Sequence, residues 1–150
     1  MDEAGKSRTV FVTVGTSKFE ALIRAVDRPE FAAALAAKGY TRLMIQKGAG
    51  KYVPCQLVPA GTTAAQHASG VCVEYFDFCP SLAAYMSSAG LVISHAGAGS
   101  VFEALLAQKP LIVVANPLMM DNHQAELADH LASMQVVVRR LKQVLLVYLI

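Results

Sequence analysis

The segment Ser94-His95-Ala96-Gly97-Ala98-Gly99-Ser100, followed by Glu103, has the residue types of a phosphate-binding turn. Gly97 and Gly99 carry no side chain, so a ligand can approach the backbone N–H groups closely. Ser100 is expected to open a helix, and the positive end of a helix attracts phosphate. Glu103 then falls in the first turn, where a carboxylate can accept two hydrogen bonds from a ribose diol. The segment therefore predicts a site for a phosphorylated ribose.

A purely structural explanation competes with this one. Ser100-x-x-Glu103 also fits a capping box, in which both side chains only satisfy backbone N–H groups of the helix. His95 has two open interpretations as well, a hydrogen-bond donor to phosphate or a loop residue that holds the end of a strand.

Two further loops carry polar groups of similar kind. Gly15-Thr16-Ser17 offers backbone amides and two hydroxyls to a diphosphate, although Thr16 or Ser17 could instead cap the next helix. Asp121-Asn122-His123-Gln124 offers the dense set of neutral donors and acceptors that sugar hydroxyls require. Capping by Asp121 and Gln124 is its alternative explanation, but it gives Asn122 and His123 no role. We favour ligand contact for the third loop.

Several other chemistries find no support in the sequence. The glycines after the fourth expected strand lack the third glycine of a dinucleotide fingerprint, and Gly48-Ala49-Gly50-Lys51-Tyr52 lacks the Ser or Thr of a P-loop. The four histidines have no metal-type spacing, so we expect no metal site and no other cofactor. A Gly-x-Ser-x-Gly nucleophile elbow is also absent from the sequence.

Strands and helices alternate along the chain and must position these loops. We expect strands at residues 10–14, 43–45, 71–76, 90–94, 111–115 and 136–138, and helices from about Phe19 and over residues 29–38, 81–89, 101–108 and 122–132. Residues 47–69 are rich in Gly, Pro, Thr and Ala and are expected to be mostly loop. This alternation predicts an α/β fold, a Rossmann-like doubly wound parallel sheet, in a single domain over residues 1–150. Because ligands bind beyond the carboxyl ends of such strands, the three loops can converge on one cleft.

Composition limits the class of protein. The chain has 150 residues, is 55% hydrophobic and only 16% charged, and its net charge of +2 gives no electrostatic case for nucleic acid. Three cysteines without a C-x-x-C pair suit a reducing compartment. The longest purely apolar run, residues 144–150, is far shorter than the ~20 residues that span a bilayer. We expect a cytosolic protein with flexible residues 1–8. A partner is expected to cover part of its apolar surface and to provide any association with a membrane.

The motifs together match one family pattern in order. They are Phe11-Val12-Thr13-Val14-Gly15-Thr16, Asp77, Leu91 to Ser100, Glu103, Lys109-Pro110-Leu111 and Asn122-His123-Gln124. From about Val10 to Leu131 the chain resembles the small catalytic subunits of the eukaryotic UDP-N-acetylglucosamine (UDP-GlcNAc) transferase that adds the second sugar to dolichol-diphosphate-GlcNAc. It is similar, more distantly, to the C-terminal half of the bacterial lipid-linked sugar transferase MurG.

The resemblance implies the C-terminal half of a GT-B glycosyltransferase, an inverting enzyme divided between two proteins. By similarity, Gly97, Ala98 and Gly99 face the diphosphate, Glu103 the ribose, and His123 and Gln124 the GlcNAc. Phe76 falls where the family packs uracil, although a core aromatic at a strand end explains it equally well. His95 is the only candidate general base in this half, and the partner can supply the base instead. The resemblance further implies a membrane-anchored partner subunit, a heterodimer, and recruitment to the cytosolic face of the endoplasmic reticulum for N-glycan precursor assembly.

The sequence departs from the family pattern over residues 139–150, an atypical apolar tail where relatives continue with a strand, a loop and a long helix. The tail is expected to be a truncated or alternatively spliced end, or a segment that docks on the partner. It keeps a second hypothesis open, a non-catalytic paralogue or isoform that binds the membrane subunit as a regulator. A third hypothesis is a nucleotide-binding module that acts alone.

Overall fold

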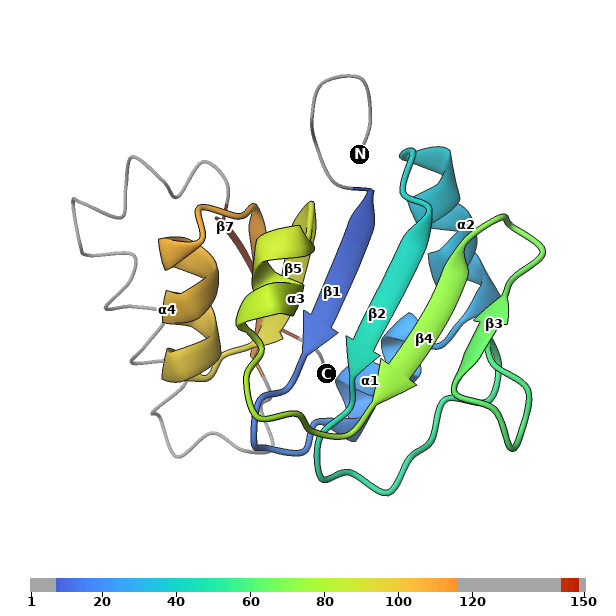
Figure 1. Ribbon diagram of the computed structural model, residues 1–150, viewed down its shortest axis with the longest axis horizontal. Helices are drawn as coiled ribbons and strands as arrows, with labels where there is room; N and C mark the ends of the chain where they lie inside the picture. Colours follow the sequence, from blue (N-terminus) through green and yellow to red (C-terminus); the bar gives the residue numbers. More distant parts are fainter. Residues whose placement is uncertain (1–7, 116–143, 149–150) are drawn as a thin grey trace.

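The computed structural model describes residues 8–115 and 144–148 (Figure 1). Within these residues the elements are β1 (Thr9–Thr13), α1 (Glu20–Val26), α2 (Pro29–Ala37), β2 (Arg42–Gln46), β3 (Ala64–Gln66), β4 (Cys72–Phe76), α3 (Ala83–Ser88), β5 (Leu91–His95), α4 (Ala98–Leu106), β6 (Leu111–Ala115) and β7 (Val144–Tyr148). The predicted helix at 122–132, the strand at 136–138 and the residues Asn122, His123 and Gln124 lie outside the described residues.

The strands form one sheet in the order β3-β4-β2-β1-β5-β6-β7. All neighbouring pairs are parallel except β3 with β4. From β1 the sheet continues through β2, β4 and β3 on one side and through β5, β6 and β7 on the other. This is the doubly wound arrangement that the sequence predicts. The topological switch point lies between β1 and β5, where ligands of such sheets bind.

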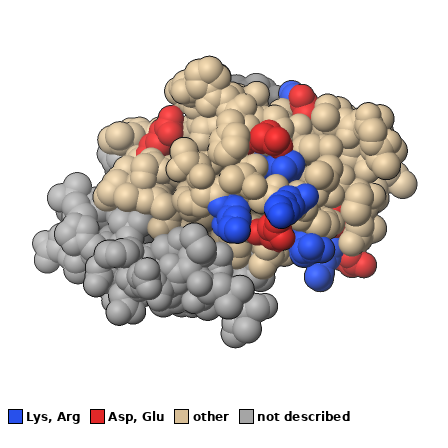
Figure 2. Space-filling model, turned by 90° about the horizontal axis from the view of Figure 1, so that it is seen from below, with Lys and Arg blue, Asp and Glu red and all other residues tan. Residues whose placement is uncertain are grey.

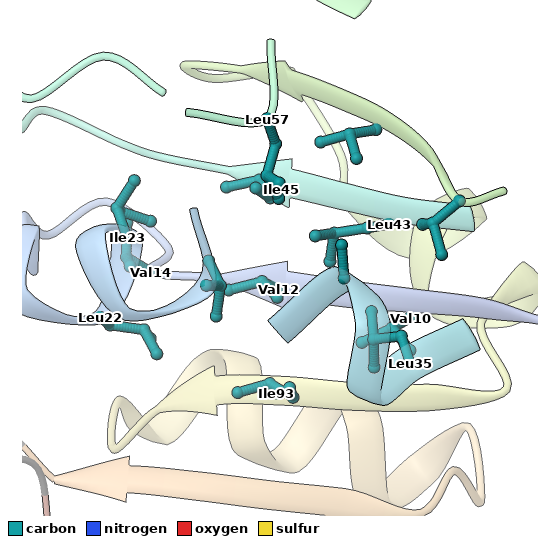
Figure 3. Close-up of a cluster of buried hydrophobic side chains, with 14 of the residues drawn as sticks. Val10, Val12, Val14, Leu22, Ile23, Leu35, Leu43, Ile45, Leu57 and Ile93 are labelled. Atoms are coloured by element: carbon teal, nitrogen blue, oxygen red, sulfur yellow. The ribbon is translucent and has the colours of Figure 1, made fainter. Parts of the chain in front are cut away.

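Alternate residues of the strands face opposite layers of helices. Val10 and Val12 of β1 enter a core with α1 and α2, while Phe11 packs with α3 and α4. Figure 1 shows α3 and α4 in front of the sheet and α1 and α2 behind it, and Figure 3 shows the aliphatic core of the rear layer. Burying each of these large apolar side chains contributes roughly 1.5–3 kcal/mol, so two layers hold the strand ends in fixed positions.

Helix signals in the sequence place most elements to within a few residues. Pro29 occupies the first turn of α2, as predicted, and Gly39 follows the helix with a φ of +87°, a conformation that suits glycine. Phe19 is the N-cap residue of α1. The predicted loop over residues 47–69 is wrong at one place, because Ala64–Gln66 pair with β4 as an antiparallel edge strand.

One other expectation is wrong in a way that concerns the site, and the tail adds a strand. Helix α4 begins at Ala98, three residues before the predicted start at Val101. The apolar tail contributes a strand that the sequence did not predict, because residues 144–148 form β7 and pair in parallel with β6, Leu111 beside Val144 and Val113 beside Leu146. A β6 made of five apolar residues leaves an edge of unpaired backbone groups that an apolar, β-branched segment can cover. No helix in the described part of the chain is long and apolar enough to cross a membrane.

Candidate functional site

An open cavity of about 590 Å³ lies at the carboxyl ends of β1, β2, β4 and β5. Its lining residues are Gly15, Thr16, Ser17, Gln46, Phe78, Cys79, Pro80, Ser81, Leu82, His95, Gly97, Ala98, Gly99, Ser100 and Glu103. The size falls within the range of small-molecule sites. Two of the three loops singled out from the sequence therefore meet here, and the third, at Asn122 to Gln124, is outside the described residues.

The start of α4 faces this cavity. The N–H groups of Gly97, Ala98, Gly99 and Ser100 have no intrahelical partner, because the first helical hydrogen bond runs from Val101 to the Gly97 carbonyl. A Cβ added at Gly99 would meet nothing within 4 Å, so the space beside that residue is open. Free N–H groups at the positive end of a nine-residue helix make an anion-binding surface.

The capping-box explanation of Ser100 and Glu103 is wrong. Gly97 is the N-cap residue of α4, so Ser100 is the third residue of the helix and Glu103 lies beyond its first turn. No side-chain hydrogen bond caps the helix. Within the described residues the Glu103 carboxylate has no hydrogen-bond or ion-pair partner, although it lines the cavity. It remains free to accept hydrogen bonds from a ligand.

His95, the last residue of β5, is held between two glycines. A Cβ on Gly15 would lie 2.8 Å from the imidazole Nε2, and one on Gly97 would collide with the ring at Cε1. Gly15 also has a φ of +61°, which favours glycine for a second reason. Both glycines are therefore required by the histidine, whereas Gly99 opens onto the cavity.

The protonation of His95 follows from its burial. Desolvation lowers the pKa of His95 from 6.5 to about 4, so the imidazole is neutral at pH 7. Its Nδ1 is the buried side-chain atom without a hydrogen-bond partner among the described residues. An orphaned acceptor is tolerated better than an orphaned N–H, which favours the tautomer with the proton on Nε2. His95 can then donate a hydrogen bond to an anionic oxygen without carrying charge.

The first loop also loses its capping explanation. Helix α1 has Phe19 as its N-cap and no side-chain cap hydrogen bond, so neither Thr16 nor Ser17 caps it. Both line the cavity beside Gly15. Their hydroxyls are therefore placed where a ligand can reach them.

The wall opposite α4 is the segment between β4 and α3. Phe78 is 54% exposed and lines the cavity with the four residues that follow it. Phe76 instead stacks on Tyr85 with ring centroids 4.7 Å apart, and Tyr85 stacks in turn on Phe11. The side chain of Phe76 therefore packs in the core. Phe78 supplies the aromatic face of the cavity.

Some lining residues were not singled out from the sequence, and two described residues that were do not line the cavity. Ala96 is buried in the front core, and Phe76 packs against the same core. Gln46 and residues 78–82 line the cavity but were not predicted to. Both follow directly on expected strands, at the carboxyl edge where the other loops were sought, so strand position alone could have found them.

The cavity contains little formal charge. Among the lining residues that the structure describes, Glu103 is the one carboxylate and there is no Lys or Arg. Figure 2 shows this end of the molecule, where basic and acidic side chains lie near each other and most of the described surface is neutral. The described residues contain no group of three or more His, Cys, Asp or Glu that could hold a metal ion. An anion here would be met mainly by backbone N–H groups and a neutral histidine.

The fold and this site define a class, the doubly wound α/β domains that bind their ligand at the switch point of the sheet. Comparison with known proteins narrows the class. A family model described as the glycosyltransferase family 28 C-terminal domain matches residues 9–149, and the chain belongs to this family.

Named relatives agree with the family. The chain is 42% identical over 124 residues to the Homo sapiens "UDP-N-acetylglucosamine transferase subunit ALG13", a match that covers 83% of this chain and 10% of the human protein. It is 33% identical over 147 residues to the Saccharomyces cerevisiae protein of the same name, covering 83% of this chain and 73% of the yeast one. The chain thus spans only about a tenth of the human relative.

Solved structures agree as well. An ALG13 solution structure superimposes with a TM-score of 0.64 at 30% identity, covering 95% of this chain and 79% of that one. Acinetobacter baumannii MurG superimposes with a TM-score of 0.65 at 20% identity, covering 97% of this chain and 38% of MurG, which shows a shared fold. The predicted GT-B glycosyltransferase half is therefore confirmed as the fold.

Proposed function

We propose that this chain is the donor-binding subunit of a two-protein UDP-GlcNAc transferase. The observation that carries the proposal is the convergence, at one switch point, of four free helix N–H groups, a neutral histidine and an uncommitted carboxylate. The names of the relatives, which are transferase subunits for UDP-N-acetylglucosamine, support the donor and the need for a second subunit.

The donor fits the cavity in a definite order. Its diphosphate accepts hydrogen bonds from the α4 N-terminus and from Nε2–H of His95, with Thr16 and Ser17 on the other side. Glu103 accepts from the ribose hydroxyls. The uracil lies along the segment between β4 and α3, near Phe76 and against the exposed ring of Phe78. The GlcNAc is assigned to Asn122, His123 and Gln124.

In the reaction, a hydroxyl oxygen of the acceptor attacks the anomeric carbon of GlcNAc with inversion. The bond from that carbon to the phosphate oxygen breaks, and UDP leaves with the electron pair. The N–H groups of α4 and His95 stabilise the charge that develops on the diphosphate. A proton must pass from the hydroxyl to a base, and a histidine with a pKa near 4 is a weak one at neutral pH. We therefore assign the base to the partner subunit.

The remaining parts of the proposal concern the assembly. The acceptor is GlcNAc-diphospho-dolichol, and the partner is a membrane-anchored subunit that holds this chain at the cytosolic face of the endoplasmic reticulum. The apolar composition of the chain agrees with a covering partner. The alternative is a non-catalytic subunit that binds the same partner as a regulator, and it predicts partner binding without transfer.

A transfer assay tests the proposal. UDP-GlcNAc and a lipid-diphosphate-GlcNAc acceptor are supplied with and without the membrane subunit, for wild type and Glu103→Gln. We expect transfer only by the complex, and a roughly tenfold or greater loss of kcat/KM in the variant, because the amide gives up one acceptor for the ribose diol.

The matched control is Glu30→Gln, the same chemical change in the exposed first turn of α2. It should leave kcat/KM unchanged. An inactive wild-type complex would overturn the proposal, and a fully active Glu103→Gln complex would overturn the ribose assignment.

A further inference from the structure

The loop that follows β2, residues 46–50, connects the two walls of the cavity although only Gln46 lines it. One wall is the first loop, Gly15 to Ser17, and the other begins at Asp77 after β4. We call residues 46–50 the β2 clamp.

Gln46 bonds to both walls through one side chain that is 1% exposed. Its Oε1 accepts from the backbone N–H groups of Val14 and Gly15 at 3.1 and 2.9 Å, and from the Thr13 hydroxyl. Its Nε2 donates to the carbonyl of Gly15 at 2.8 Å and to that of Asp77 at 2.7 Å. Both amide protons and the acceptor oxygen are thus occupied by protein groups, which leaves none for a ligand.

The backbone of the clamp repeats this bridging. The N–H of Lys47 donates to the carbonyl of Phe76 at 2.8 Å, and the N–H of Gly48 donates to the carbonyl of Asp77 at 3.2 Å. The N–H of Ala49 donates to the carbonyl of Ser17 at 3.2 Å. The buried Lys47 ammonium also lies 3.1 Å from the Asp77 carboxylate. The separation of the two walls is therefore set by a segment that contacts both.

Gly48 lies directly under the first wall. Its φ is +67°, and a Cβ there would be 2.5 Å from Cγ2 of Val14 and would overlap the carbonyl oxygen of Ser17. Backbone cannot yield as a flexible side chain can, so any side chain at position 48 must displace the first wall.

We infer that Gln46 and Gly48 are positioning residues for donor binding, which fix the distance between the diphosphate loop and the nucleobase wall without touching the donor themselves. The inference rests on the proposed function. A ligand held from both sides is sensitive to small misplacements of either side.

Substitution of the glutamine tests the inference. Gln46→Met removes all five hydrogen bonds at similar volume, and Gln46→Glu keeps the acceptor but loses both donated bonds. In the complex with the membrane subunit, we expect the KM for UDP-GlcNAc to rise about tenfold or more in both variants, with kcat at saturating donor within about threefold of wild type. Binding of UDP to the chain should weaken in parallel.

A control of equal burial separates positioning from loss of stability. Leu43→Ala, on the same strand and fully buried in the rear core, lowers the thermal midpoint but removes no contact to either wall. Its KM for UDP-GlcNAc should stay within about twofold of wild type.

A pair of glycine variants provides a second test. Gly48→Ala strains the backbone and displaces the first wall. Gly61 also has a left-handed backbone, with a φ of +82°, but a Cβ added there would meet no atom within 4 Å, so Gly61→Ala causes the strain without the displacement. Both should lose stability, but only Gly48→Ala should weaken UDP binding, by about tenfold.

The outcomes keep the two proposals apart. If wild type binds no UDP and transfers no sugar, the proposed function fails. If wild type is active and the Gln46 and Gly48 variants keep the KM of their controls, the positioning inference is overturned. A fall in kcat with unchanged KM would also overturn it.

Discussion

At the scale of single residues, His95 combines burial with a missing partner. The imidazole is 7% exposed, its Nδ1 has no hydrogen bond among the described residues, and two glycines make room for the ring. A buried polar atom of this kind costs free energy unless a ligand or solvent compensates. We interpret the unpartnered Nδ1 as the consequence of an imidazole orientation that directs Nε2–H toward the site.

The protonation of His95 should appear in the pH dependence of stability. The unfolded histidine has a pKa near 6.5 and the folded one about 4, so between these values the unfolded state binds the extra proton. The stabilising contribution is complete above pH 6.5 and is lost as the pH falls toward 4. Urea unfolding should show a decrease on the order of 2 kcal/mol from pH 7 to 4.5. In His95→Asn this slope should flatten, and an unchanged slope would contradict the assignment.

Gly99 is expected to matter to the ligand and not to the fold. Gly99→Ala meets no protein atom within 4 Å and lies in the first turn of α4, where alanine is the better helix former. The free energy of unfolding should therefore stay the same or rise by up to about 1 kcal/mol. UDP binding, measured by calorimetry, should weaken at least tenfold, because the methyl group occupies the space beside the free N–H groups. Equal binding would remove Gly99 from the diphosphate site.

At the scale of elements, the early start of α4 changes the meaning of its residues. The sequence predicts a start at Val101 with Ser100 opening the helix, and the low helix propensity of Gly97 and Gly99 disfavours an earlier start. In the structure Ser100 is buried together with Val101, Ala104 and Leu105, so the buried side of α4 extends beyond its predicted start. The shift frees Glu103 from capping, and the four N–H groups without an intrahelical partner become those of residues 97–100 instead of residues 100–103.

The long segment between β2 and β3 has an anchor that the sequence did not reveal. Asp27 is fully buried at the end of α1 and accepts hydrogen bonds from the Tyr52 hydroxyl and the backbone N–H groups of Cys55, Gln56 and Leu57. Burial and the bond to Asp27 raise the pKa of Tyr52. A short-range pattern gives no sign of contacts that span 25 to 30 positions.

Removal of this anchor should destabilise the chain strongly. Asp27→Ala leaves three backbone N–H groups without their acceptor, at a cost of about 3 kcal/mol or more. Asp27→Asn should cost less, since the amide oxygen can replace Oδ2. Urea unfolding measures both, with exposed Glu30→Ala as a control expected within about 0.5 kcal/mol of wild type. A cost below about 1 kcal/mol for Asp27→Ala would show that the segment is held elsewhere.

At the scale of the whole molecule, β7 is the last strand in the sheet and covers β6. Strand β7 pairs with all five residues of β6, so the apolar β6 is internal. The family match, over residues 9–149, includes both strands. Without β7, β6 would be the edge strand on this side of the sheet.

A chain that ends at residue 143 should therefore aggregate. Its β6 would become an exposed apolar edge strand, which is a template for pairing with other molecules. We expect a lower unfolding midpoint in urea and oligomers in light scattering. A truncated chain that stays monomeric with wild-type stability would contradict the role of β7.

A feature of this protein could be predicted from the sequence where it depends on residues close together in the chain. The alternation of apolar strands with helices, the proline that opens α2 and the glycines around His95 are local, and they determined the α/β class, the element order and two of the loops that meet at the cavity. Contacts between distant segments decided the rest. The buried side of α4 extends beyond its predicted start, stacking on Tyr85 kept Phe76 in the core and left Phe78 in the cavity, and pairing with β6 turned an apolar tail into a strand. The sequence by itself determined which groups could bind a nucleotide; only the tertiary structure decided which are free to do so, because a donor, a carboxylate or an aromatic ring is available to a ligand only where no other part of the chain has already engaged it.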